Sequence, residues 1–199
     1  MRIESVIATA AAALLSTAGH AAVVIDQNQP IGAEYIASFE QSDLAQSFQQ
    51  ANENIAGAGI FMEPDIGSTD TVTISLWDAL PNQAGANLLT SGSGSATAGA
   101  WFDVFWDPVA IASGSTYYLV FTSLSDTLGI SGSINNPYAF GKTYANAGFN
   151  PFDIYDYTFR TYYDNETVPS TGQVPTPATA LLIGFGFAGL ALSRRRFLT

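Results

Sequence analysis

The sequence predicts an all-β fold, an antiparallel β-sandwich, over residues 22–168, and three observations support this prediction. Several short segments alternate polar and apolar residues, which places their apolar side chains on one face of a strand. Clusters of Gly, Pro, Asn and Ser separate these segments. No long amphipathic helix is expected between them. A jelly roll is the first choice among such sandwiches, and an immunoglobulin-like Greek key is the second.

The segment 71–77 alternates most regularly, because Val72, Ile74 and Leu76 share one face and polar residues occupy most of the other. The segment 155–163 places aromatic and threonine side chains on one face in the same way. Further strands are expected at 101–106 and 116–121, and weaker ones at 23–26, 45–49, 55–63, 87–91, 128–131 and 138–144. Turns are expected at 64–67, 81–83, 91–94, 113–115 and 135–137.

Residues 1–21 have the organisation of a secretory signal peptide. Arg2 supplies a positive start, 6–18 is a compact apolar region, and Gly19-His20-Ala21 offers a small-x-small cleavage pattern. The apolar region is too short to favour a transmembrane helix that is retained. His20 is the only histidine and the chain has no cysteine, so we expect a mature protein with neither residue and without disulfides.

The C-terminal segment 174–199 contains three features in a fixed order. Its first four residues are stiff and extended, because each proline fixes its own φ and disfavours helix at the preceding residue. Residues 178–193 are uncharged and apolar all round, which favours a transmembrane helix over a buried helix of a soluble domain. Such a helix would cover about 24 Å at roughly 1.5 Å per residue, and the arginines after it could snorkel to complete the span. The three arginines at 194–196 indicate that residues 194–199 are a cytosolic tail.

This three-part tail resembles the PEP-CTERM sorting signal of Gram-negative bacteria. That signal has a Pro-Glu-Pro motif, a short transmembrane helix and a terminal arginine cluster; in this chain a threonine stands in place of the usual Glu. The resemblance implies that exosortase, a membrane protease, removes the tail during export. It therefore implies a precursor anchored in the inner membrane, with linker 169–177 before its helix, and a product at the cell surface or outside the cell. The matching positions are Val174, Pro175, Thr176, Pro177, Arg194, Arg195 and Arg196.

The central domain contains the succession AQSF, AGAGIFM, VTISLWDA, GSTYYLVF and DYTFRTYY. In this succession it resembles the exported sandwich domains often found ahead of such tails. Many of those domains are similar to carbohydrate-binding modules, so the resemblance implies contact with a saccharide.

The central residues 22–168 are strongly acidic. The chain has 17 acidic and 6 basic residues, and of the basic residues only Lys142 and Arg160 fall in this region. Since Glu4 is the one acid outside it, the region carries a net charge of about −14 at neutral pH. Such a surface repels nucleic acid and anionic lipid, and it attracts divalent cations. Solubility of a secreted protein is the simpler explanation of the charge.

The composition limits the catalytic chemistry that the mature chain could perform. Without histidine and cysteine, Ser-His-Asp, Cys-His and His-ligated metal catalysis are excluded. A Ser–Lys pair would depend on Lys142, which lies in a Gly-rich turn where a solvated lysine is expected. A glycosidase needs two carboxylates at a defined separation, and the sequence alone does not give the distance between any two of its acids. The carboxylate candidates are Asp103, Asp107, Asp153 and Asp156. We therefore expect no enzymatic activity.

Glu63, Asp65 and Asp70 are the leading calcium candidates, because they offer hard oxygen ligands around one turn. Similar groups of acids occur at 153–156 and 164–166. None matches the spacing of an EF-hand loop, and the preference of aspartate for turns explains them more simply. No other cofactor is expected.

Trp77 and Trp101 are the candidates for sugar binding. Trp77 follows Thr73 and Ser75 on the polar face of its strand, and Trp101 shares a face with Asp103. An indole on an exposed strand face can stack on a pyranose ring. Packing in the core or under loops is the alternative for both, because tryptophan is usually largely buried.

Three classes of function follow from these observations. The first is an exported surface or matrix protein, processed by exosortase, with a structural or adhesive role in an extracellular polysaccharide layer. The second is a carbohydrate-binding module with a defined sugar site. The third is a glycoside hydrolase acting through a carboxylate pair.

Overall fold

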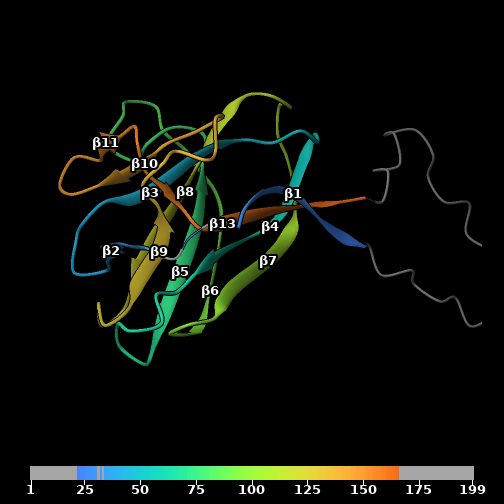
Figure 1. Cartoon of the computed structure of the whole chain (residues 1–199). Coiled ribbons are helices and arrows are strands. Elements are labelled where there is room, and N and C mark those ends of the chain that lie inside the picture. Colours follow the sequence, from blue (N-terminus) through green and yellow to red (C-terminus); the bar gives the residue numbers. More distant parts are fainter. Residues whose placement is uncertain (1–21, 31, 33, 166–199) are drawn as a thin grey trace, which may run out of the picture. The chain divides into compact units, whose positions relative to one another are not determined.

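The computed structural model describes residues 22–30, 32 and 34–165, and in this part of the chain it contains thirteen β-strands and no helix (Figure 1). The strands are β1 Val23–Gln29, β2 Glu34–Ser38, β3 Leu44–Gln49, β4 Asn54–Phe61, β5 Thr69–Trp77, β6 Leu88–Thr97, β7 Trp101–Ala110, β8 Thr116–Ser123, β9 Gly129–Ser133, β10 Thr143–Ala145, β11 Asn150–Phe152, β12 Asp156–Tyr157 and β13 Phe159–Asp164. The prediction of an all-β fold is confirmed.

The strands form three antiparallel sheets. The first sheet has the order β1-β13-β4-β7, and the second has the order β11-β10-β3-β8-β5-β6. A smaller third sheet has the order β12-β9-β2. The described strands therefore have the arrangement of a β-sandwich, with two large sheets and a short third one.

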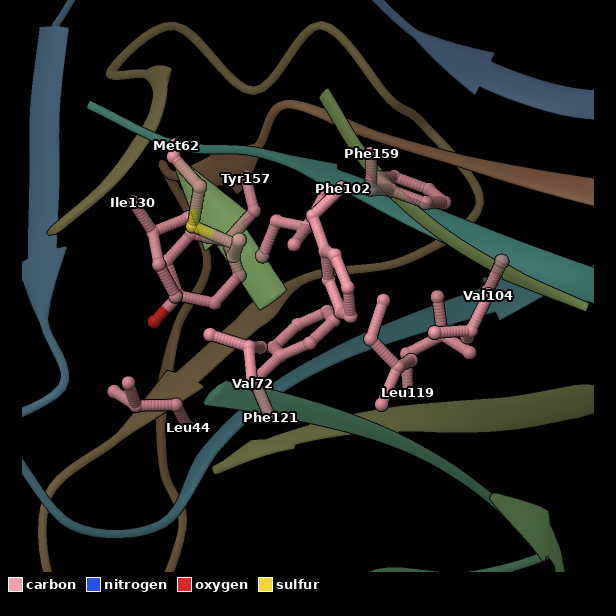
Figure 2. Packing of buried hydrophobic residues seen from close by; sticks show 14 of the residues in the cluster. Leu44, Met62, Val72, Phe102, Val104, Leu119, Phe121, Ile130, Tyr157 and Phe159 are labelled. Atoms are coloured by element: carbon pink, nitrogen blue, oxygen red, sulfur yellow. The ribbon is translucent and has the colours of Figure 1, made fainter. Parts of the chain in front are cut away.

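One hydrophobic core holds the first and second sheets together. Figure 2 shows side chains of both sheets packed in one cluster, with Phe102 and Val104 from β7 near Leu119 and Phe121 from β8. Tyr157 of β12 also belongs to this core, and its ring packs edge-on against that of Phe121 with 5.8 Å between the centroids. Burial of these apolar side chains is the main force that stabilises the sandwich.

The alternation predicted for 71–77 is present in β5. Val72, Ile74 and Leu76 are completely buried, whereas the residues between them are exposed or half-buried. This strand lies between β8 and β6 in the second sheet. Its inner face carries the three residues that belong to the core, and its outer face carries the others.

The single strand predicted at 155–163 is wrong, because the chain changes sheets in the middle of it. β12 pairs with β9 in the third sheet, and β13 pairs with β1 and β4 in the first. Both faces are covered at this crossing, so that Asp156 and Tyr157 are both fully buried. Alternation therefore does not separate an inner from an outer face here.

The turn predicted at 91–94 is also wrong, since these residues lie in the middle of β6. Gly92 and Gly94 face β7 instead of forming a turn. A Cβ atom on Gly92 would lie 2.8 Å from the Cβ of Val104, and one on Gly94 would lie 3.2 Å from the ring of Phe102. The glycines thus permit two strands to approach closely. The sequence patterns also missed β2 and β11.

Several predictions fall outside the described residues: the signal peptide 1–21, the linker 169–177 with its preceding residues 166–168, the span 178–193 and the basic tail 194–199. Within the part that the structure does describe, no helix is long and apolar enough to cross a bilayer.

Candidate functional site

The outer face of the first sheet carries a group of aromatic and charged side chains, which we call the aromatic platform. Alternate residues of β7 and β13 point into the core, so their neighbours in sequence point outward. The aromatic platform consists of Phe61 of β4, Trp101, Asp103 and Phe105 of β7, and Arg160 and Tyr162 of β13.

Two glycines of β4 form the floor of the aromatic platform. β4 lies between β7 and β13, and Gly59 is paired with Asp103 on one side and with Arg160 on the other. A Cβ atom on Gly59 would lie 2.0 Å from Oδ1 of Asp103, and one on Gly57 would lie 2.7 Å from the ring of Phe105. The missing side chains therefore let residues of β7 extend across β4 and reach β13.

Asp103 is the polar centre of the aromatic platform. Its Oδ1 accepts hydrogen bonds from Nε of Arg160 at 2.7 Å and from the hydroxyl of Tyr162 at 2.8 Å, and its Oδ2 accepts a second bond from the guanidinium. The side chains of Asp103 and Arg160 are each only 20% exposed, so this bidentate ion pair is partly shielded from solvent. It fixes the orientation of both side chains.

The protonation states at this centre are set by the same contacts. The hydrogen bond that Arg160 donates to Asp103 raises the pKa of Arg160, with burial acting in the opposite direction. Burial, together with the hydrogen bond to Asp103, raises the pKa of Tyr162 well above its usual range. Arg160 therefore stays charged and Tyr162 stays a neutral hydrogen-bond donor at all physiological pH values.

Aromatic rings lie at both ends of this polar centre. At one end, Cζ of Arg160 lies 4.0 Å from the centroid of the Trp101 ring, a cation–π contact, and Phe61 meets the same ring edge-on at 5.6 Å. At the other end, Phe105 packs on Tyr162 with centroids 5.0 Å apart. Phe105 is nevertheless 58% exposed, so most of its ring is open to solvent.

An open groove of about 620 Å³ runs beside the aromatic platform. It is lined by residues 92–95 of β6 and 101–105 of β7, the terminal strands of the second and first sheets. The groove is thus lined by Trp101, Asp103 and Phe105 of β7 together with glycines and serines of β6. Such a combination of apolar rings with a few fixed polar groups suits a ligand with flat apolar faces and many hydroxyl groups.

Trp77 lies on the outer face of the second sheet, whereas Trp101 lies on the outer face of the first, so the structure does not bring the two predicted residues together. Trp77 packs against a second hydrophobic cluster. This cluster contains Ala45, Leu80, Val120 and Phe149, with Tyr118 and Tyr144 packed beside them. The Nε1 of Trp77 is buried without a hydrogen-bond partner among the described residues.

The three predicted calcium ligands have separate environments. Asp70 is buried, and its carboxylate accepts hydrogen bonds from the hydroxyl of Ser123 at 2.5 Å and from backbone N–H groups, including that of Thr71 at 2.7 Å. Glu63 accepts a bond from the hydroxyl of Ser131 at 2.7 Å, and Asp65 lies in an exposed turn. Among the described residues, no three His, Cys, Asp or Glu side chains gather as metal ligands.

The pKa of Asp70 reflects this network. Burial opposes ionisation, but the hydrogen bonds from Ser123, Thr127 and Thr71 outweigh it and lower the pKa to about 2. The ionised carboxylate of Asp70 thereby orders the connection between β8 and β9, because residues 125 and 127 donate to it through their backbone N–H groups.

The carboxylates considered for glycoside hydrolysis also have different surroundings. Asp103 is bound to Arg160, and Asp153 forms an exposed ion pair with Lys142. Asp156 is fully buried, where it accepts bonds from the side chain of Gln46 at 3.0 Å and the backbone N–H of Tyr138 at 2.9 Å. Burial raises its pKa, against the effect of these two bonds.

Sequence reasoning missed Phe105, Arg160 and Tyr162 as site residues. Arg160 could have been noticed, because it is one of two basic residues in an acidic domain and lies among aromatic residues. The pair Gly57 and Gly59 inside an apolar strand was a second signal, since a glycine within a strand often marks a close approach of other atoms.

Comparison with known proteins gives no assignment, since neither a protein-family model nor a curated protein sequence matches the chain.

Proposed function

We propose that the chain is an exported surface or matrix protein that adheres to extracellular polysaccharide through the aromatic platform. The observation that carries this proposal is the outward-facing arrangement of Trp101 and Phe105 on either side of the Asp103–Arg160 pair. Aromatic rings can stack on the apolar faces of sugar rings, and the polar centre can bond their hydroxyl groups.

The tail sequence supports the exported location. We propose that exosortase recognises the motif Val174-Pro175-Thr176-Pro177 and cleaves a precursor that is anchored by residues 178–193. Replacing Arg194, Arg195 and Arg196 with Gln is then expected to reduce membrane retention and maturation of the precursor, because cationic ends anchor the cytosolic side. Cell fractionation checks this, and wild-type retention with normal maturation would contradict it.

We also propose that the sandwich is a jelly roll. The strand order supports this assignment when β2 and the short strands β9 to β12 are set aside. The remaining eight strands, numbered along the chain, lie in the order 1-8-3-6 in the first sheet and 2-7-4-5 in the second. Such nesting of the first strands with the last is what two successive Greek keys produce.

The proposed role is adhesive and not catalytic. The sequence of the described domain contains no histidine and no cysteine, and its two basic residues are both held in ion pairs. A carbohydrate-binding module with a defined sugar site is the second candidate, and the exposed ring of Phe105 beside a groove favours it.

Binding of polysaccharide by the full chain tests this proposal. The protein is purified in a detergent that contains no sugar and is titrated with soluble polysaccharides while tryptophan fluorescence is measured. Phe105→Ala is expected to weaken binding about tenfold, which corresponds to the loss of ~1.4 kcal/mol from one stacking contact. Phe140→Ala is the matched control, because Phe140 is 61% exposed and lies outside the aromatic platform. Equal effects of the two substitutions, or no binding at all, would contradict the proposal.

A further inference from the structure

We propose that the aromatic platform selects a neutral glycan chain over an anionic one, and that the chain lies along β7 from Trp101 to Phe105. This inference rests on the proposed function and assigns it a class of ligand. Two features of the molecule support it: the charges around the aromatic platform and the distance between its two aromatic ends.

The cations of the described domain are already committed to carboxylates. Lys142 and Arg160 are the only basic residues in the sequence of 22–165, and they are paired with Asp153 and Asp103. Arg160 is further occupied by the ring of Trp101. A uronate or sulfate group would therefore meet a guanidinium whose charge Asp103 already neutralises. It could bind Nε and Nη2 together only by leaving the partly buried carboxylate of Asp103 without its partner, which is costly.

The electrostatic field of the whole domain also disfavours an anionic glycan. The sequence of 22–165 contains 15 acidic residues beside these two basic ones. Its net charge of about −13 at neutral pH repels a polyanion during approach and at contact. A neutral glycan meets no such penalty.

The platform is longer than one sugar ring. Trp101 and Phe105 are four residues apart on β7 and face the same side, which separates their Cα atoms by about 13 Å at roughly 3.3 Å per residue. Asp103 and its partners occupy the space between them. A chain of sugar rings can contact both aromatic ends and the polar centre together, whereas a monosaccharide can contact only one part.

The preference is tested by titrating the full chain, in a sugar-free detergent and with EDTA present to remove bridging cations, with two sets of polymers. The neutral set is dextran, galactomannan and xyloglucan; the anionic set is alginate, polygalacturonate and hyaluronan. We expect binding to at least one neutral polymer, little change with ionic strength, at least about tenfold weaker binding of its monosaccharide units, and no binding of the anionic set. Binding of the anionic set alone would overturn this inference but leave the proposed adhesion to polysaccharide intact. If neither the neutral nor the anionic polymers bind, the proposed function is overturned as well.

The role of the ion pair is tested separately with Asp103→Asn. This substitution keeps the shape of the side chain but removes the charge that holds Arg160, so the variant is expected to gain salt-sensitive binding of alginate. Asp153→Asn is the control, because it frees Lys142 at an exposed ion pair away from the aromatic platform. Equal alginate binding by Asp103→Asn and the wild type would show that Asp103 does not withhold Arg160 from anions, and would overturn that part of the inference.

Discussion

The outer faces of the two large sheets are both rich in aromatic residues, but only one of them is covered by residues from outside the strands. On the second sheet, Trp77, Tyr118 and Tyr144 pack beside a hydrophobic cluster that includes Leu80 and Phe149, which lie outside the strands. On the first sheet, side chains of the strands themselves make the surface, and they extend over a floor of glycine. The second face therefore anchors loops by apolar burial, whereas the first leaves Phe105 open to solvent.

This difference shows why the outward position of a tryptophan on a strand does not reveal its role. Trp77 and Trp101 both occupy outer positions of their strands. What distinguishes them is the neighbouring structure: apolar residues of connecting segments beside Trp77, and a guanidinium held by a carboxylate over Trp101. Substitutions at four places test this difference, from the largest expected effect to the smallest.

The largest effect is expected from Ile74→Asp on the inner face of the second sheet, which is compared with a substitution on the outer face of the same strand. Ile74 is fully buried, so an aspartate there would place an unpaired carboxylate in the core and destabilise the domain by more than about 4 kcal/mol. Thr73→Asp is the control, because Thr73 faces outward and its hydroxyl forms a hydrogen bond with that of Ser93. Thermal unfolding of the full chain measures both, and equal shifts of the midpoint would contradict the assignment of the faces.

Leu80→Ala tests whether the second outer face works as a small core. Leu80 is buried in the second cluster, so we expect a loss of about 3 kcal/mol in the free energy of unfolding. Phe105→Ala removes a larger side chain from the first outer face but is expected to cost only about 1 kcal/mol, because its ring is mostly exposed. Denaturant unfolding compares them. A greater loss with Phe105→Ala would reverse our view of the two faces.

Asp70→Asn tests the carboxylate that orders the connection beside the second sheet. Because the folded pKa is about 2, below the ordinary value of 3.8, the stabilisation is present above about pH 4 and is lost as pH falls through 2. At neutral pH the variant is expected to lose about 2 kcal/mol, since several bonds to a charged acceptor are weakened. The difference in stability between variant and wild type, measured as a function of pH, should shrink toward pH 2. Asp65→Asn, in an exposed turn, is the control, and an equal loss there would refute the special role of Asp70.

Gly59→Ala is expected to have the smallest effect on stability and a specific effect on binding. The added methyl group would meet the end of the Asp103 side chain, which can turn outward into water when no glycan is bound. Hydration then replaces most of the lost ion pair, so the free energy of unfolding should fall by no more than about 1 kcal/mol. The displaced carboxylate would lose its present geometry with Arg160 and Tyr162. Glycan affinity should therefore fall while the melting midpoint is nearly preserved. Unchanged affinity would show that the glycine floor is not needed.

Part of the fold could be predicted from the sequence, because alternation and turn residues are local signals. The strand at 71–77 is the clearest case, since one of its faces meets the core and the other does not. The segment 155–163 could not be predicted, because the chain passes between two sheets there and both of its faces are covered. The glycines of β6 look like a turn in sequence but serve the close packing of Val104 and Phe102.

The candidate site could be predicted only in part for the same reason. Trp101 and Asp103 share a face because they lie two residues apart on one strand, which the sequence does indicate. Their partners Arg160 and Tyr162 are more than 50 residues away, as the separations of 57 and 59 residues in the two contacts with Asp103 show. Such partners depend on the order of strands in the sheet, which local patterns do not specify.

The most direct test of the account is fluorine NMR of the full chain labelled with fluorotryptophan. The chain has three tryptophans, so its signals can be assigned by single Trp→Phe substitutions. Addition of a neutral glycan that binds is expected to shift the signal of Trp101, at the aromatic platform, and to leave that of Trp77 unchanged in its apolar cluster. A shift of the Trp77 signal with none at Trp101 would contradict the account, because it would place binding on the opposite outer face.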